Sequence, residues 1–192
     1  MKILLVGAHG TVGRGVAAEL GEDSAALAWR RAQWLGAMQP GKAPQAFDWA
    51  IQRAREAADG ASLRQAQLAL AEWQLRRSQL VAAAAAIKGL ATDDPQALEL
   101  RARIAIERGE LAVARTHLDA ADAIWRARGR LGESRRTRLG MVEVALRAGE
   151  HADAAARAEA LIAEAGRQGD TRLDGELLQA LGRAQTGLGQ LE

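Results

Sequence analysis

Apolar positions follow two different patterns along this 192-residue chain. Ile3 to Val6 form one short continuous apolar run, which is typical of a buried parallel strand. After residue 22 the chain instead alternates helical stretches of about a dozen residues or more with short turns. This second pattern predicts helix pairs at 24–38 with 44–59, 62–77 with 79–90, 96–108 with 111–127 and 132–148 with 151–166, followed by an unpaired helix at 172–187.

The predicted turns share one spacing, in which a small residue is followed five positions later by an alanine. The pairs are Gly41 and Ala46, Ser78 and Ala83, Gly109 and Ala114, and Gly149 and Ala154. A fifth turn of this kind begins at Gly189. The spacing resembles the tetratricopeptide repeat, in which two antiparallel helices meet at a tight turn and an alanine lets their backbones approach closely. Three residues depart from that repeat: Arg101 takes a usual leucine position, Arg138 is out of pattern, and Trp34 stands where a small residue is expected.

The resemblance implies an all-α fold, with antiparallel helix pairs stacked as a right-handed superhelix. We expect this array to occupy residues 23–192, with its last repeat incomplete, and residues 1–22 to form a separate leader. An incomplete last repeat would leave Leu178 and Leu181 without their usual cover, so we expect self-association or fraying at that helix.

The leader carries Gly7, Gly10 and Gly13 directly after the apolar run. This stretch resembles the opening of short-chain dehydrogenases, where such glycines bring backbone amides against a pyrophosphate. The resemblance implies an alternative reading as an NAD(P)-binding protein. No second strand follows, however, and the chain contains no tyrosine for the hydride chemistry of that family. We therefore expect the leader to be vestigial or foreign, as in a fusion or fragment, and to bind neither NAD nor NADP.

Composition narrows the remaining function classes. The 26 basic residues nearly balance the 24 acidic ones, cysteine is absent, and only three histidines are scattered along the chain. These counts argue against a disulfide framework, a metal site and a strongly basic nucleic-acid binder. No segment resembles a membrane span or a signal peptide, which favours the cytoplasm. No nucleophile, base and orienting acid stand at meaningful spacing, so we expect no enzyme activity and no cofactor.

The repeat resemblance implies that the first helix of each pair lines a concave groove for a protein or peptide partner. By the helix positions of that family, the groove residues would be Gln65, Glu72, Arg76, Gln96, Glu99, Arg103, Glu107, Arg136, Glu143 and Arg147. Their mixed charges suit hydrogen bonds and ion pairs to an extended or helical peptide. We therefore expect a non-catalytic interaction scaffold, part of a larger bacterial regulatory protein. The alternative is that these positions are simply solvated and bind nothing.

Two further groups of residues could bind ligands. The arginine-rich stretch, residues 126–138, could hold a phosphate or an acidic segment, but we favour an exposed corner kept soluble by its charge. The five tryptophans could stack on a ligand, but residues spread over separate helices more often anchor packing. These are Trp29, Trp34, Trp49, Trp73 and Trp125.

Overall fold

A computed structural model of the chain describes residues 24–168 and 173–189. Over these residues the secondary structure is entirely helical, with nine α-helices, one short 3-10 helix and no strand. The expectations for the leader, including the strand at 3–6 and the glycines Gly7, Gly10 and Gly13, lie outside the described residues. The chain divides into two compact units, Met1–Gly89 and Leu90–Glu192.

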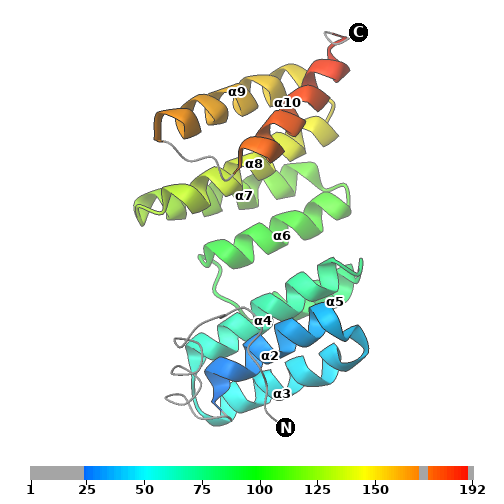
Figure 1. The fold of residues 1–192 in the computed structure, drawn as a ribbon, viewed down its shortest axis with the longest axis vertical. Helices are drawn as coiled ribbons and strands as arrows, with labels where there is room; N and C mark the ends of the chain where they lie inside the picture. The colour runs from blue at the N-terminus through cyan, green and yellow to red at the C-terminus, as the bar shows by residue number, and fades with distance from the viewer. Residues whose placement is uncertain (1–23, 169–172, 190–192) are drawn as a thin grey trace. The chain divides into compact units, whose positions relative to one another are not determined.

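The first unit is built from two helix pairs, drawn in blue to green in Figure 1. Helix α2 (Ala25–Met38) leads through a 3-10 turn (Pro40–Lys42) into α3 (Ala43–Glu56), and α4 (Gly60–Leu75) is followed by α5 (Leu80–Ile87). Small residues of α2 and α3 pack with Phe47 and Trp73 to form the core. Because most of the α2 and α3 contact positions are alanines, these helices can approach closely.

The second unit contains five helices, each packed against the next along the chain (Figure 1). They are α6 (Pro95–Glu107), α7 (Leu111–Ala127), α8 (Leu131–Arg147), α9 (His151–Gln168) and α10 (Asp174–Gly187). Two apolar clusters hold them, one between α6, α7 and α8 and the other between α8, α9 and α10. None of the described helices of the chain combines the length and apolarity needed to cross a membrane.

The predicted helices are confirmed to within a few residues at their ends. The largest shifts are three residues, at the ends of α5 and of α3, and α4 begins at Gly60 rather than residue 62. The cause is Asp59, whose carboxylate accepts a hydrogen bond from the backbone amide of Ser62 at 3.0 Å and thereby caps α4. The prediction had extended the preceding helix through Asp59, but α3 ends at Glu56.

Three of the predicted turns share one backbone geometry. Ser78, Gly109 and Gly149 all adopt a left-handed conformation, with φ of 57°, 76° and 75°. One residue after each of them, a backbone amide donates back across the turn to a carbonyl of the preceding helix at 2.9 Å. This bond satisfies one of the carbonyls that a helix end leaves without a partner. The small residue predicted at these turns is therefore required by backbone conformation, which only glycine adopts without strain.

The alanine five positions after each of these turns lies in the interior of its unit. Ala83, Ala114 and Ala154 are completely buried. The predicted Gly41 turn is different, because Gly41 lies in the 3-10 helix and is not among the residues with positive φ. Ala46 is only half-buried there, and the core side of α3 is formed by Ala43, Phe47, Ala50 and Ala54 instead. The assignment of Gly41 and Ala46 to the common turn spacing is therefore wrong.

Candidate functional site

Helices α6, α8 and α10 carry charged side chains that form hydrogen bonds and ion pairs with one another. Each of these is the first helix of a predicted pair or the last, unpaired helix. Arg147 on α8 donates through Nη2 to Glu107 of α6 at 3.2 Å and through Nε to Glu143 at 2.9 Å. The other carboxylate oxygen of Glu143 accepts from Nη1 of Arg183 on α10 at 2.8 Å. We call Glu107, Glu143, Arg147 and Arg183 the charge ladder. It alternates in sign and links α6, α8 and α10.

Sequence reasoning identified three of the four ladder residues. Glu107, Glu143 and Arg147 belong to the predicted groove, and the structure brings them together. Arg183 was missed, although a signal for it exists. It stands six positions before Gly189, as Glu143 stands six before Gly149 and Arg103 six before Gly109. Counting backwards from the last turn would have placed it in the same register.

The ladder keeps Glu143 ionised. Burial by itself would raise the pKa of this carboxyl, but hydrogen bonds from Arg183 and Arg147, and their positive charges, outweigh burial and hold the pKa below its usual value. The pKa of Arg147 is raised in turn, chiefly by its hydrogen bond to Glu143. Both groups therefore stay charged across the physiological range.

The remaining groove residues differ in how accessible they are. Arg76, Gln96, Arg103 and Arg136 are exposed, and Gln65, Glu72 and Glu99 are half-buried. Gln65, Glu72 and Arg76 belong to the first unit, on α4 or directly after it. Arg103 and Arg136 make no hydrogen bond or ion pair with the described residues. Their guanidinium groups are therefore available to an incoming acceptor.

Glu99 is engaged inside the second unit. Its Oε1 accepts a hydrogen bond from the indole Nε1 of Trp125 on α7 at 2.9 Å and another from the hydroxyl of Thr137 on α8. Trp125 and Thr137 are both buried. This carboxylate therefore joins three helices and satisfies two buried donors.

The arginine-rich stretch is the expected exposed corner only in part, because Arg126, Arg128, Arg130 and Arg136 are exposed but Arg135 and Arg138 are not. Arg135 is only 5 % exposed, and Arg138 forms a two-pronged ion pair with Glu164 of α9, with both N–O distances at 2.8 Å. Arg126 pairs with Asp122 at 2.8 Å, and Arg130 pairs with Glu133. The acidic partners stand on α7, α8 and α9, so part of the charge of this stretch is neutralised within the unit.

Asp122 is the residue of this region that sequence reasoning missed. It is buried on α7, where it accepts a hydrogen bond from the hydroxyl of Ser134 on α8 and pairs with Arg126. Arg138 also approaches its carboxylate, at 3.8 Å. A buried aspartate on a helix face gives little signal in sequence, since exposed and buried acids look the same until the neighbouring helix is placed.

The packing interpretation of the tryptophans is confirmed for Trp73 and Trp125, which are buried and donate to Gly36 and Glu99. Trp29 and Trp49 are half-buried, each with a guanidinium over its ring. Trp34 is an exception, because 37 % of it is exposed. The interpretation as a packing anchor is therefore wrong for Trp34.

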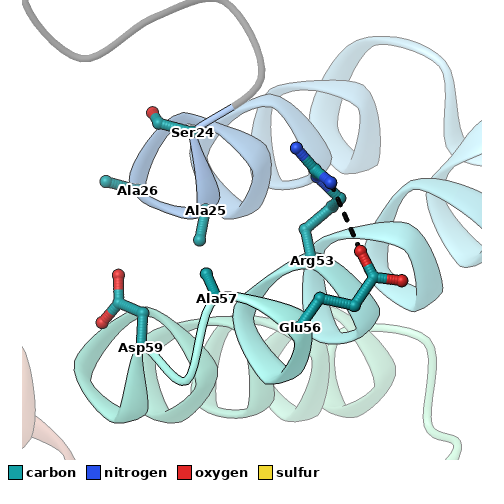
Figure 2. Close-up of a pocket in the computed structure, with 7 residues that line it drawn as sticks. All are labelled: Ser24, Ala25, Ala26, Arg53, Glu56, Ala57 and Asp59. Carbon is teal, nitrogen blue, oxygen red and sulfur yellow. Dashed lines mark hydrogen bonds and ion pairs between the residues drawn. The ribbon is translucent and has the colours of Figure 1, made fainter.

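A depression of about 530 Å³ lies in the first unit, where the start of α2 meets the end of α3 (Figure 2). Its lining includes Ser24, Arg53, Glu56 and Asp59. Arg53 and Glu56 pair with each other at 3.3 Å, and Asp59 caps α4. Its charged groups thus already have structural partners.

Within residues 24–168 and 173–189, no group of three His, Cys, Asp or Glu side chains could hold a metal ion. No family model matches the chain, and no curated protein and no solved structure shows significant similarity to it.

Proposed function

We propose that the helical part of this chain is a tetratricopeptide-like array that serves as a non-catalytic scaffold. It binds a peptide or a helix of a partner protein along the face that carries the charge ladder. The proposal places the protein in the cytoplasm, as part of a larger regulatory protein. The observation that carries it is the charge ladder itself, in which side chains from three successive first helices form one continuous polar strip.

The two arginines of the charge ladder have further N–H groups that can donate hydrogen bonds to a ligand. A guanidinium offers five N–H donors, and Arg147 uses two of its nitrogens in the ladder while Arg183 uses one. The ion pairs also restrict the side chains before a ligand arrives, so that less conformational entropy is lost on binding. A peptide carbonyl or carboxylate could therefore bind to arginines that are already held in position.

Arg103 and Arg136 extend this strip with two exposed cations. Arg103 occupies the same register on α6 as Glu143 on α8, and Arg136 lies near the start of α8. A ligand with an acidic residue near each of them would gain charge-assisted hydrogen bonds. Reversing the charge of these two arginines should therefore weaken binding most.

The test is capture of a partner by the intact chain, followed by mapping of the partner to a short peptide and titration of that peptide. We expect the double variant Arg103→Glu with Arg136→Glu to weaken peptide binding by about tenfold or more, since two attractive pairs become repulsive. The control is Arg167→Glu, an exposed arginine on the second helix α9, which should leave the affinity unchanged. Equal binding by the wild type and the double variant would contradict the proposal.

A further inference from the structure

Helix α2 exposes two large apolar side chains and two arginines near its C-terminal half. Trp34 is 37 % exposed and Met38 is 64 % exposed, and Arg30 and Arg31 are exposed as well. Arg30, Trp34 and Met38 follow one another at four-residue spacing, so they form a stripe along one side of the helix. We call Arg30, Arg31, Trp34 and Met38 the outer face of α2.

The inner side of the same helix carries three alanines, and Trp29 also packs against the unit core. Ala25, Ala28 and Ala32 are buried against the unit core. Gly36 lies directly against Trp73 of α4, since a Cβ atom placed on Gly36 would be 2.6 Å from the Trp73 ring. Helix α2 therefore keeps one large apolar side chain, Trp29, against the core and leaves two others, Trp34 and Met38, partly or largely exposed.

The surroundings of the outer face are basic. Residues 25–42 contain Arg30, Arg31 and Lys42 and no aspartate or glutamate. The contact between Gly36 and Trp73 places the last turn of α4 beside the last turn of α2, and Arg77 follows there with its guanidinium 5.1 Å from the Trp73 ring. Residues 24–89 contain nine Lys and Arg and four Asp and Glu, whereas residues 90–192 contain 15 Lys and Arg and 17 Asp and Glu. The positive charge of the chain is therefore concentrated in the unit that contains this face.

We propose that the outer face of α2 is a docking surface for an acidic amphipathic helix of a partner protein. Trp34 and Met38 would pack against apolar side chains of that helix at i and i+4, and Arg30 and Arg31 would pair with its flanking carboxylates. Trp, Met and Arg are the residue types enriched where proteins bind one another. The surface shares no residue with the groove proposed above and stands independently of it.

The chemistry of the face favours a peptide over a nucleic acid or a lipid surface. A single-strand binder needs several open aromatic rings, but the rings of Trp29 and Trp49 have guanidinium groups over them at 5.4 Å and 6.0 Å. Trp34 alone offers no platform for successive bases. An interfacial membrane helix needs a broad apolar face, whereas α2 exposes only two large apolar side chains.

The test uses the full chain and a fluorescein-labelled synthetic 16-residue peptide that places leucine at i, i+3, i+4 and i+7 and glutamate on both flanks. We expect saturable binding by fluorescence anisotropy that weakens as salt is added. The double variant Trp34→Ser with Met38→Ser should weaken binding at least tenfold, and Arg30→Glu should weaken it several-fold. Hydrogen exchange should show protection of α2 on binding.

Matched controls come from the same unit and from the groove. Val81→Ser removes an exposed apolar residue of α5, Arg55→Glu reverses an exposed cation of α3, and Arg103→Glu alters the groove face, so all three should bind the peptide as the wild type does. The proposal is overturned if the Trp34 and Met38 variant binds equally well, or if a scrambled peptide of the same composition does. It is overturned equally if a 20-nucleotide single strand or phosphatidylserine vesicles bind this face more tightly than the acidic peptide.

Discussion

At the scale of single residues, acidic partners decide how the arginine-rich stretch behaves. Arg138 and Glu164 are joined by two parallel hydrogen bonds, and both side chains are mostly shielded from solvent. Such two-pronged pairs are stronger than ordinary surface ion pairs because the geometry is fixed and water is partly excluded. The pair therefore ties α8 to α9.

Replacing Glu164 with glutamine should lower the free energy of unfolding by about 1–2 kcal/mol at pH 7, because Arg138 would lose a charged acceptor in a partly buried place. The hydrogen bond from Arg138 holds the pKa of Glu164 below its usual value of 4.5. A carboxyl whose pKa is lowered in the folded protein stabilises the fold at pH values above its usual pKa. This stabilisation is lost as the pH falls through the lowered pKa. The difference between wild type and variant should therefore be constant from pH 7 to about 5 and shrink at lower pH.

Urea denaturation across that pH range measures the effect. The control is Asp153→Asn, which breaks an exposed pair with Arg157 within one helix and should change stability by less than about 0.5 kcal/mol. An equal loss in the two variants would show that burial adds nothing to the Arg138 pair.

At the scale of helices and turns, a left-handed residue recurs after α3, α4, α6, α7, α8 and α10. Glycine occupies it at Gly109, Gly129, Gly149 and Gly189, but Ala58 and Ser78 hold it in the first unit, with φ of 50° and 57°. A side chain costs about 1 kcal/mol in this conformation, since Cβ crowds the neighbouring carbonyl. The first unit therefore carries backbone strain at two turns that the second unit avoids.

Ser78→Gly and Ala58→Gly should each stabilise the protein by about 0.5–1 kcal/mol, because relief of the strain exceeds the extra entropy of the unfolded chain. Thermal or urea unfolding measures this gain. Ala85→Gly, at an exposed position inside α5, should destabilise by a similar amount. If all three glycines destabilise, the left-handed geometry of the two turns is not that of the protein in solution.

At the scale of the whole molecule, α10 differs from the other first helices in the described chain. Leu98 on α6 and Leu178 on α10 each stand eleven residues before a turn glycine. Leu98 is 5 % exposed, whereas Leu178 is 58 % exposed. Leu181, the other apolar residue expected to lack cover, is partly buried against the cluster of α8 and α9.

We therefore expect the protein to self-associate through α10 as its concentration rises, which sedimentation equilibrium would detect. Leu178→Glu should abolish the association, because it would bury a charge at the contact. Val113→Glu, at an exposed apolar position of α7, should leave it intact. A wild type that stays monomeric at high concentration would contradict this expectation.

The sequence by itself determined the helices, most of their ends and three of the common turns. These features are local, because apolar spacing selects the helix and a left-handed residue ends it. Close packing was also readable at Ala83, Ala114 and Ala154, since only a small residue fits between touching backbones. The first turn was misread because a 3-10 helix replaced the left-handed glycine.

Only the tertiary structure decided which side chains meet. Arg147 and Glu107 are 40 residues apart, Arg138 and Glu164 are 26 apart, and the buried Asp122 looks in sequence like any solvated acid. The outer face of α2 was hidden for the same reason, because the neighbouring helices bury Trp29 and the alanines of α2 but leave Trp34 partly exposed. Helical period shows which residues share a face, but the neighbouring helix supplies the partner that buries or neutralises them.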